Sequence, residues 1–256
     1  MITLDLIGIG SGNPDHVTAQ AAKAMDRADL ILVPLKGEDK ADLAGLRYRI
    51  IESCVTNPAT HVQGFDLPVR DPATPDYLAR VSDWHDAIAL AWEAAIRPHL
   101  RPEVPLKVAL LVWGDPSLYD SSLRIAERLA KRLPLTLRVT PGITAIQALC
   151  AAHAIPLNGL GAPVTITTGR ALRETGWPAG SDTVVILLDA GGAFGTLDPT
   201  GISIWWGAYV GMEEEILISG PLAEVASQIL ETRSSARAAH GWIMDIYLMR
   251  REPALP

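Results

Sequence analysis

In the first part of the chain, short apolar runs alternate with stretches in which apolar residues recur at helical spacing. The nearly continuous apolar runs predict buried parallel strands, at residues 3–9, 30–33, 107–113 and 135–139. The helical spacing predicts helices, at residues 14–27, 39–53, 76–97, 121–132 and 143–154. The proline-rich stretch 58–75 predicts a long loop with a strand near Val62. This order is typical of a parallel α/β domain.

The pattern changes in the second part of the chain. Apolar and alternating runs predict strands, at residues 164–168, 183–188, 202–209, 215–218 and 242–249. A helix is predicted with the same clarity only at residues 222–232, after Pro221. We therefore predict an α/β protein of two domains, a parallel one over residues 1–140 and one with a mixed sheet over residues 141–256.

Composition and charge narrow the class of protein. The 256 residues carry a net charge of −7 without a dense Lys/Arg cluster, which argues against a nucleic-acid partner. No apolar run reaches the roughly 18 residues of a membrane span, and no signal peptide is visible, so we expect a cytoplasmic protein without a membrane partner. The six histidines show no metal-binding spacing, so we expect no metal. Cys54 and Cys150 fit structural thiols better than a disulfide or a nucleophile.

Three loops rich in Gly, Pro and Asp follow apolar strands and lead into helices, at residues 8–15, 114–116 and 141–144. Open α/β sheets bind ligands beyond the carboxyl ends of their strands, where glycine lets the backbone approach a ligand closely. A single loop of this kind is better explained as a tight turn between a strand and a helix. The three together favour a ligand site at one edge of the sheet.

The first loop also indicates which ligand to expect. A dinucleotide fingerprint GxGxxG fails in both registers, because its third glycine falls on Asn13 or on Asp15. The chain also has no GxxxxGK[ST] motif. Since the charge of Asp15 disfavours a phosphate, a ligand that is cationic or lacks phosphate fits these loops better.

The three loops resemble those of the tetrapyrrole methylases, which are methyltransferases that use S-adenosylmethionine. The family pattern GxGPGDP…LT appears at residues 8–18 as GIGSGNPDHVT, although Asn13 replaces a glycine. Residues 114–119 (GDPSLY), 139–145 (VTPGITA) and 154–157 (AIPL) match further family motifs in the same order. The segments GNPDHVT, KGEDKADLAGLR, WWGAY and ILISGPL resemble one member of the family more specifically.

This resemblance implies a homodimer of two-domain chains, with S-adenosylmethionine in a cleft between the domains. The cofactor-binding residues that it implies are Pro14, Trp113, Gly114, Asp115, Thr144, Ala145, Leu188, Ala208, Tyr209, Gly241 and Trp242. An alternative for Asp115 is a helix N-cap, because an Asp at a helix start looks identical in sequence.

The resemblance also implies methylation of a tetrapyrrole that carries many carboxylates, together with loss of an acetyl group. Water attack on an acetyl carbonyl benefits from a general base, for which Asp15 and His16 are candidates. Their alternatives are a capping residue and a solvated helix residue. Cationic residues that would meet the carboxylates are Lys36, Lys40, Arg47 and Arg124, with a solvated charged face as the alternative. Of the adjacent Trp205 and Trp206, at least one should belong to the core.

Three other functions remain open from the sequence. One is a methylase of the same fold that acts on another large acceptor. Another is a reductase that uses NAD(P), which the broken fingerprint disfavours. The third is a protein that binds an S-adenosyl ligand without turnover.

Overall fold

A computed structural model of the chain describes residues 1–35, 41–70 and 76–251. The chain divides into two compact units, Met1–Thr144 and Ala145–Pro256, and each is described by itself. In the described part of the chain, no helix combines the length and the apolar character needed to cross a membrane.

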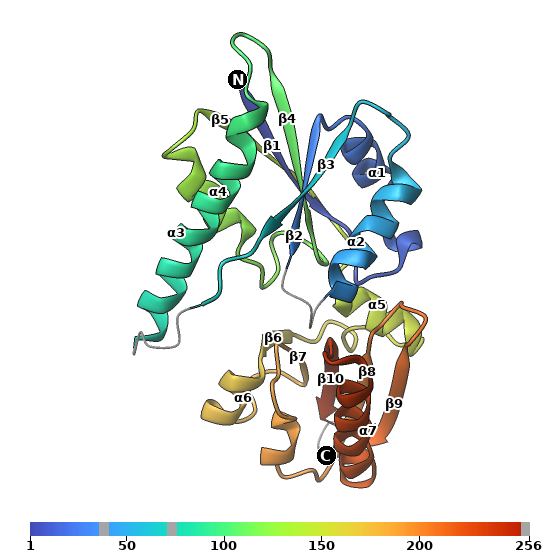
Figure 1. Cartoon of the computed structure of the whole chain (residues 1–256). Coiled ribbons are helices and arrows are strands. Elements are labelled where there is room, and N and C mark those ends of the chain that lie inside the picture. The colour runs from blue at the N-terminus through green and yellow to red at the C-terminus, as the bar shows by residue number, and fades with distance from the viewer. Residues whose placement is uncertain (36–40, 71–75, 252–256) are drawn as a thin grey trace. The chain divides into compact units, whose positions relative to one another are not determined.

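The first unit is built on a parallel sheet with the strand order β3-β2-β4-β1-β5 (Figure 1). Its strands are β1 (Ile2–Gly8), β2 (Leu30–Leu35), β3 (His61–Asp66), β4 (Leu106–Val112) and β5 (Leu135–Thr140). The strand predicted near Val62 is therefore β3. Because β1 lies between β4 and β5, the carboxyl ends of these three strands are neighbours at one edge of the sheet.

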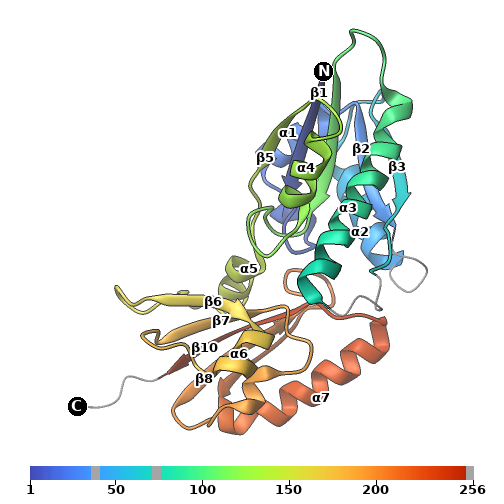
Figure 2. The same ribbon diagram turned by 90° about the vertical axis from the view of Figure 1, so that its left-hand side faces the viewer.

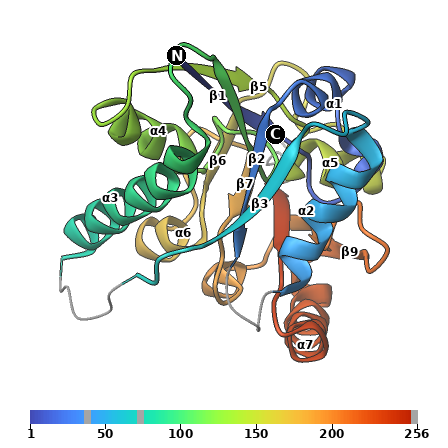
Figure 3. The same cartoon turned by 45° about the horizontal axis from the view of Figure 1, so that its top comes forward.

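Helices cover both faces of this sheet. They are α1 (Ala19–Asp26), α2 (Ala41–Cys54), α3 (Tyr77–Ile96) and α4 (Ser122–Ala130), with the 3-10 turns η1 (Pro14–His16) and η3 (Arg97–His99). Figures 1 and 3 show α3 and α4 side by side on one face and α1 and α2 on the other. The apolar side chains accordingly form two clusters, one around Leu4 and Trp92 and one around Ile7 and Met25.

The segment after β1 differs from the continuous helix predicted for residues 14–27. Pro14–His16 forms a 3-10 turn, Val17 is extended, and α1 begins only at Ala19. Two caps impose this break. Asn13 Oδ1 accepts a hydrogen bond from the Asp15 amide at 2.9 Å, and Thr18 Oγ1 accepts one from the Ala21 amide at 3.0 Å. Asp15 and His16 therefore lie on a separate turn before the helix.

The second unit has a mixed sheet with the strand order β6-β7-β10-β8-β9. Its strands are β6 (Val164–Thr168), β7 (Thr183–Leu187), β8 (Ile202–Ala208), β9 (Ile216–Pro221) and β10 (Asp245–Arg251). Its helical segments are α5 (Ala145–Ala152), α6 (Gly169–Thr175), η4 (Ala193–Thr196) and α7 (Leu222–His240). Among the described strands of this unit, only β6 and β7 are parallel neighbours, and the other pairs are antiparallel.

The helices of the second unit also lie on both faces of their sheet (Figure 2). α6 and α7 cover the face that carries the main apolar cluster, while α5 lies on the opposite face. Trp206 is fully buried in that cluster and Trp205 is half-buried, which agrees with the prediction that at least one of them belongs to the core.

Three element boundaries in this unit correct the sequence prediction. α7 continues beyond the predicted end at residue 232 and ends at His240, where Gly241 adopts φ +72°. The short α6 is not predicted, because seven residues are too few for a helical period to stand out. β10 begins at Asp245 rather than at Trp242, and residues 242–244 precede the strand.

Candidate functional site

The loops after β1, β4 and β5 meet at three glycines. A Cβ placed on Gly8 would lie 2.6 Å from the Gly142 nitrogen and 2.7 Å from the Gly114 carbonyl oxygen. A Cβ placed on Gly142 would overlap the same Gly114 oxygen and lie 2.8 Å from the Gly8 backbone. Real Cβ atoms do not approach so closely, so no side chain fits at either position. We call this group of residues the glycine junction: Gly8, Gly114 and Gly142.

Left-handed backbone at the start of the loops adds a second requirement for glycine. Gly10 and Gly114 have φ +80° and +62°, a region that other L-residues adopt only at a cost. The two residues also pair across the loops, because the Gly114 amide donates to the Gly10 carbonyl at 2.7 Å. The first two predicted loops are therefore tied together through their backbones.

Asp115 ties the second loop to the third. Its Oδ2 accepts a hydrogen bond from the Gly142 amide at 2.9 Å, and its Oδ1 accepts one from the Ser117 amide at 2.8 Å and another from the Ser117 hydroxyl. Partial burial acts to raise the pKa of Asp115, but these three hydrogen bonds outweigh it and hold the pKa below its usual range. The alternative role as a helix N-cap is wrong, because α4 begins only at Ser122.

Arg47 lies in the interior of the first unit, against the ring of Trp113, which directly precedes Gly114. Its side chain comes from α2 and is only 8% exposed, and its guanidinium carbon lies 4.6 Å from the centre of the Trp113 ring. Nε and Nη1 donate to the carbonyl oxygens of Leu111 and Leu43, at 3.4 and 3.3 Å. Burial lowers the pKa of Arg47 to about 10, and the nearby Asp120 partly offsets that effect. Arg47 is therefore not on a solvated charged face.

The turn after β1 carries both predicted acid–base residues. Pro14 and Asp15 are exposed, and the Asp15 amide is bound by Asn13. His16 is half-buried, and its Nδ1 is buried without a hydrogen-bond partner. A Cβ on Gly10 would lie 2.8 Å from the His16 Cβ, so the turn packs directly on the first loop. His16 is therefore held in place with one nitrogen unsatisfied.

Thr144 and Ala145 stand at the end of the third loop. Thr144 belongs to the first unit, and its Cα would lie 3.6 Å from a Cβ placed on Gly114, so it borders the second loop. Ala145 is the first residue of α5 in the second unit.

The predicted cofactor residues of the second unit gather at one edge of its sheet. β7 and β8 lie on either side of β10, and both pair antiparallel with it. They therefore run in the same direction, so Leu188 and Tyr209 follow strand ends at the same edge of the sheet. Both residues adopt a left-handed backbone, with φ +53°. Tyr209 is buried after Ala208, and its hydroxyl donates to the Trp242 carbonyl at 2.6 Å. The rings of Tyr209 and Trp242 meet edge to face, with their centres 5.0 Å apart. Trp242 directly follows Gly241.

The predicted substrate residues lie in different surroundings. Arg124 is exposed on α4, where its Nη1 donates to the Asp120 carbonyl at 2.9 Å. Lys36 and Lys40 lie outside the described residues. Among the residues that are described, no group of three or more His, Cys, Asp or Glu is arranged to hold a metal ion.

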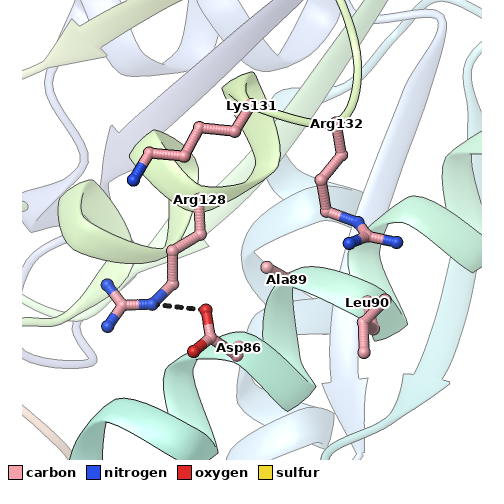
Figure 4. A pocket seen from close by; sticks show the side chains of 6 residues that line it. All are labelled: Asp86, Ala89, Leu90, Arg128, Lys131 and Arg132. Carbon is pink, nitrogen blue, oxygen red and sulfur yellow. Dashed lines mark hydrogen bonds and ion pairs between the residues drawn. The ribbon is translucent and has the colours of Figure 1, made fainter.

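A cavity of about 390 Å³ lies apart from these loops, between α3 and α4 (Figure 4). Its lining includes Asp86, Arg128 and Arg132, with Arg128 Nε 2.7 Å from Asp86 Oδ1. Arg132 is paired with the buried Glu93 of α3. Since both arginines already have carboxylate partners, these charges join the two helices, and we do not assign a ligand to this cavity.

Sequence reasoning missed two residues that hold the loops. Ser117 follows Asp115 by two positions, a spacing typical of an Asx turn, and this signal could have identified it. Asp189 comes directly after Leu188 and is 6% exposed. A carboxylate between a strand end and the pair Gly191-Gly192 was the available signal for a structured loop there.

Comparison with solved structures places this fold among tetrapyrrole methyltransferases. A putative cobalamin synthesis related protein (CobF) from Corynebacterium diphtheriae is 37% identical, with a TM-score of 0.83 over 98% of this chain and 99% of that one. The uroporphyrin-III C-methyl transferase of Thermus thermophilus, complexed with S-adenyl homocysteine, shares the fold at 17% identity, with a TM-score of 0.60 over 97% and 92% of the two chains.

Sequence comparison gives the family. The pattern of the Tetrapyrrole (Corrin/Porphyrin) Methylases matches residues 3–226. The precorrin-6A synthase [deacetylating] of Sinorhizobium sp is 48% identical over 248 residues, which is 96% of this chain and 94% of that protein. The precorrin-2 C(20)-methyltransferase of Sinorhizobium sp is 29% identical over 59% and 58% of the two chains. The chain therefore belongs to the tetrapyrrole methylase family and is a methyltransferase, and the predicted α/β fold of that family is confirmed.

The glycine junction predicts opposite effects for two Gly→Ala variants. Gly142→Ala should lower the free energy of unfolding by about 1–3 kcal/mol or more, because its methyl group would overlap backbone. Gly45→Ala in α2 should raise it by about 0.5–1 kcal/mol, because that position is open and helical. Urea unfolding of both variants checks this, and equal stability of the two would contradict it.

Asp115→Asn should destabilise the fold at neutral pH by about 1–3 kcal/mol, because the new amide would face the Gly142 amide donor. The pKa of Asp115 is lowered in the folded state, so its contribution is complete above the ordinary value of about 3.9 and is lost as the pH falls through the lower folded value. The difference between wild type and variant should therefore shrink in acid.

Urea unfolding at pH 7 and near pH 3 measures that change. The matched control is Asp198→Asn, because the exposed Asp198 accepts from the Thr200 amide in a turn of the same kind but joins no second loop. A difference for Asp115→Asn that is constant or larger in acid would contradict the assigned role.

Proposed function

We propose that this protein uses S-adenosylmethionine to methylate C-1 of precorrin-5 and releases the ring acetyl group as acetate, giving precorrin-6A and S-adenosylhomocysteine. The observation that carries the proposal is the 48% identity to a precorrin-6A synthase over 96% of the chain. The glycine loops and their order along the chain support the same reading.

The loops of the first unit fit a cofactor that lacks phosphate. The glycines of the junction bring three backbones together without side chains, and Asp15 and Asp115 supply negative charge on the adjoining loops. Opposite charges attract at short range, so these carboxylates suit a sulfonium or an ammonium group. We propose that Pro14, Trp113, Gly114, Asp115 and Thr144 bind the cofactor from this unit.

The second unit offers the half-buried Trp242, which the buried Tyr209 supports, for an adenine ring. We propose that Leu188, Ala208, Tyr209, Gly241 and Trp242 bind the cofactor from this unit, together with Ala145. Tyr209 and Trp242 are fixed by their mutual contact, and Trp242 Nε1 is buried without a hydrogen-bond partner. An indole N–H in that state has an unused donor for a ligand acceptor.

The chemistry divides into two steps with different needs. In methyl transfer, a ring carbon of the electron-rich macrocycle attacks the sulfonium methyl group, and S-adenosylhomocysteine leaves. Holding both reactants in line lowers the barrier, an effect worth about 7–11 kcal/mol in well-oriented systems. In deacetylation, water adds to the acetyl carbonyl, the bond from that carbon to C-1 breaks, and its electron pair returns to the macrocycle.

Deacetylation needs a base to take a proton from the attacking water. We propose Asp15 or His16 for this role, because both lie on the turn that packs on the first glycine loop. The exposed Asp15 is accessible to a large substrate, and His16 has a nitrogen without a partner.

The substrate carboxylates need cationic partners. We propose Arg124 on the surface of α4 for this role, together with Lys36 and Lys40 from outside the described part of the chain. Arg47, predicted for the same role, is buried and donates to the carbonyl oxygens of Leu111 and Leu43, so it is a structural residue of the first unit. A guanidinium can bind a carboxylate through two parallel hydrogen bonds. We further propose that the enzyme works as a homodimer in the cytoplasm.

Incubation with precorrin-5 and methyl-labelled S-adenosylmethionine tests the whole proposal. The expected products are a singly labelled macrocycle and one equivalent of acetate, measured by mass spectrometry. A labelled macrocycle without acetate would indicate a methylase of another type. Binding of S-adenosylhomocysteine without turnover would indicate a binding protein, and either result would overturn the proposal.

Variants at residues 15 and 16 test the assignment of the base. In Asp15→Asn or His16→Gln, loss of the base should slow acetate release, because the attack of water then becomes about 10²-fold slower or more. At least one variant should therefore release acetate far more slowly than wild type. The control is His61→Gln, an exposed histidine on β3. Acetate release at the wild-type rate by both variants would contradict the assignment.

A further inference from the structure

The residue after β7 is held in an unusual state. Leu188 has φ +53°, a backbone conformation that a leucine rarely adopts, and its side chain is 67% exposed. Neither the backbone nor the exposed apolar side chain is favourable by itself. Such residues persist only where the surrounding structure holds them, and they concentrate at ligand sites.

The neighbouring Asp189 holds this loop through its carboxylate. The side chain is buried, and its Oδ2 accepts hydrogen bonds from the Ala193 amide at 2.5 Å and from the Tyr247 hydroxyl at 2.7 Å. Its Oδ1 accepts from the Gly191 amide at 3.1 Å and forms an ion pair with Arg173. All of these partners come from the loop itself, from α6 and from β10.

A second cation fixes the backbone of the same loop. Arg233 on α7 donates through Nη2 to the Asp189 carbonyl at 2.8 Å and through Nη1 to the Ala190 carbonyl at 3.4 Å. Its Nε is bound by Asp245 Oδ2 at 2.8 Å. On the opposite side, a Cβ on Gly169 would overlap the Asp189 carboxylate, so glycine is required where α6 begins. The loop is therefore fixed from three elements.

The ionised state of the Asp189 carboxylate is consistent with its role as a hydrogen-bond acceptor. Burial acts to raise the pKa of Asp189, but hydrogen bonds from Ala193, Tyr247 and Gly191, together with the charge of Arg173, leave it below its usual range. Burial and the charge of Asp189 raise the pKa of Tyr247, which therefore stays protonated and donates. At neutral pH all four hydrogen bonds are present.

We propose that Asp189 is a positioning residue for methyl transfer, which holds the backbone of Leu188 in the left-handed conformation that meets the cofactor. This inference rests on the proposed function, in which Leu188 is a cofactor-binding residue. Asp189 acts through Leu188 and does not touch the reacting atoms. Loss of its carboxylate should therefore raise the Kd for the cofactor more than it lowers kcat.

Two substitutions of graded severity test the proposal. Asp189→Asn places an amide where the Ala193 amide and the Tyr247 hydroxyl donate. Tyr247→Phe removes one hydrogen bond and leaves Asp189 with three, so it stays informative where Asp189→Asn fails to fold. The matched control is Ile229→Val, a buried apolar position on α7 that makes no polar contact with the loop and whose shortening lowers stability.

The readout is the Kd of S-adenosylhomocysteine by calorimetry, together with KM for S-adenosylmethionine and kcat. Asp189→Asn should raise Kd and KM by about tenfold, which corresponds to about 1.4 kcal/mol, with a smaller change in kcat at saturation. Tyr247→Phe should move the same constants in the same direction by less. Ile229→Val should leave Kd within about twofold of wild type while lowering the melting temperature.

A rescue separates positioning from general stability. Glycine adopts positive φ without strain, so adding Leu188→Gly to Asp189→Asn should recover part of the lost affinity. Wild-type Kd in both Asp189→Asn and Tyr247→Phe would overturn the proposal, as would an equal loss in Ile229→Val or no recovery with glycine. If the wild-type protein does not bind S-adenosylhomocysteine, the proposed function fails as well. If the wild-type protein binds it and the variants bind it with the same Kd, only the role of Asp189 is refuted.

Discussion

The close approach of three backbones at Gly8, Gly114 and Gly142 is the constraint on which the loops at the carboxyl edge of the first sheet depend. Parallel pairing of β4, β1 and β5 brings the ends of these strands together, and the absence of side chains lets the loops meet. Asp115 then locks the second loop to the third through the Gly142 amide. The chemistry proposed for this edge therefore relies on backbone held in place by packing and by one carboxylate.

Both units use the same physical device to shape a loop. In each one, an aspartate at a strand end accepts backbone N–H groups from residues that follow it or from a neighbouring loop. Hydrogen bonds to the charged form keep the pKa of Asp115 and of Asp189 low in spite of burial. In sequence, such a carboxylate looks the same as a helix cap, and the structure shows that both aspartates organise their loops.

Much of the fold could be predicted from the sequence, because apolar runs and helical periods mark long elements well. The strands of both sheets and the long α3 follow from such patterns. The break between Pro14–His16 and α1 could not be predicted, because it depends on two local caps. The burial of Arg47 was also beyond reach, since a helical arginine looks the same in sequence whether it faces solvent or an indole ring. The sequence shows that these glycines belong to loops. Their contact with one another could not be predicted, because it depends on the register in which β4, β1 and β5 pair.

Hydrogen–deuterium exchange with and without S-adenosylhomocysteine tests most directly whether these loops form the cofactor site. We predict slower exchange of amides in residues 8–16, 113–118 and 141–144 of the first unit, and in residue 145 and residues 188–193 of the second. Residues around the cavity between α3 and α4 should exchange at the same rate in both states. Protection confined to α3 and α4, with no change in the glycine loops, would contradict the account.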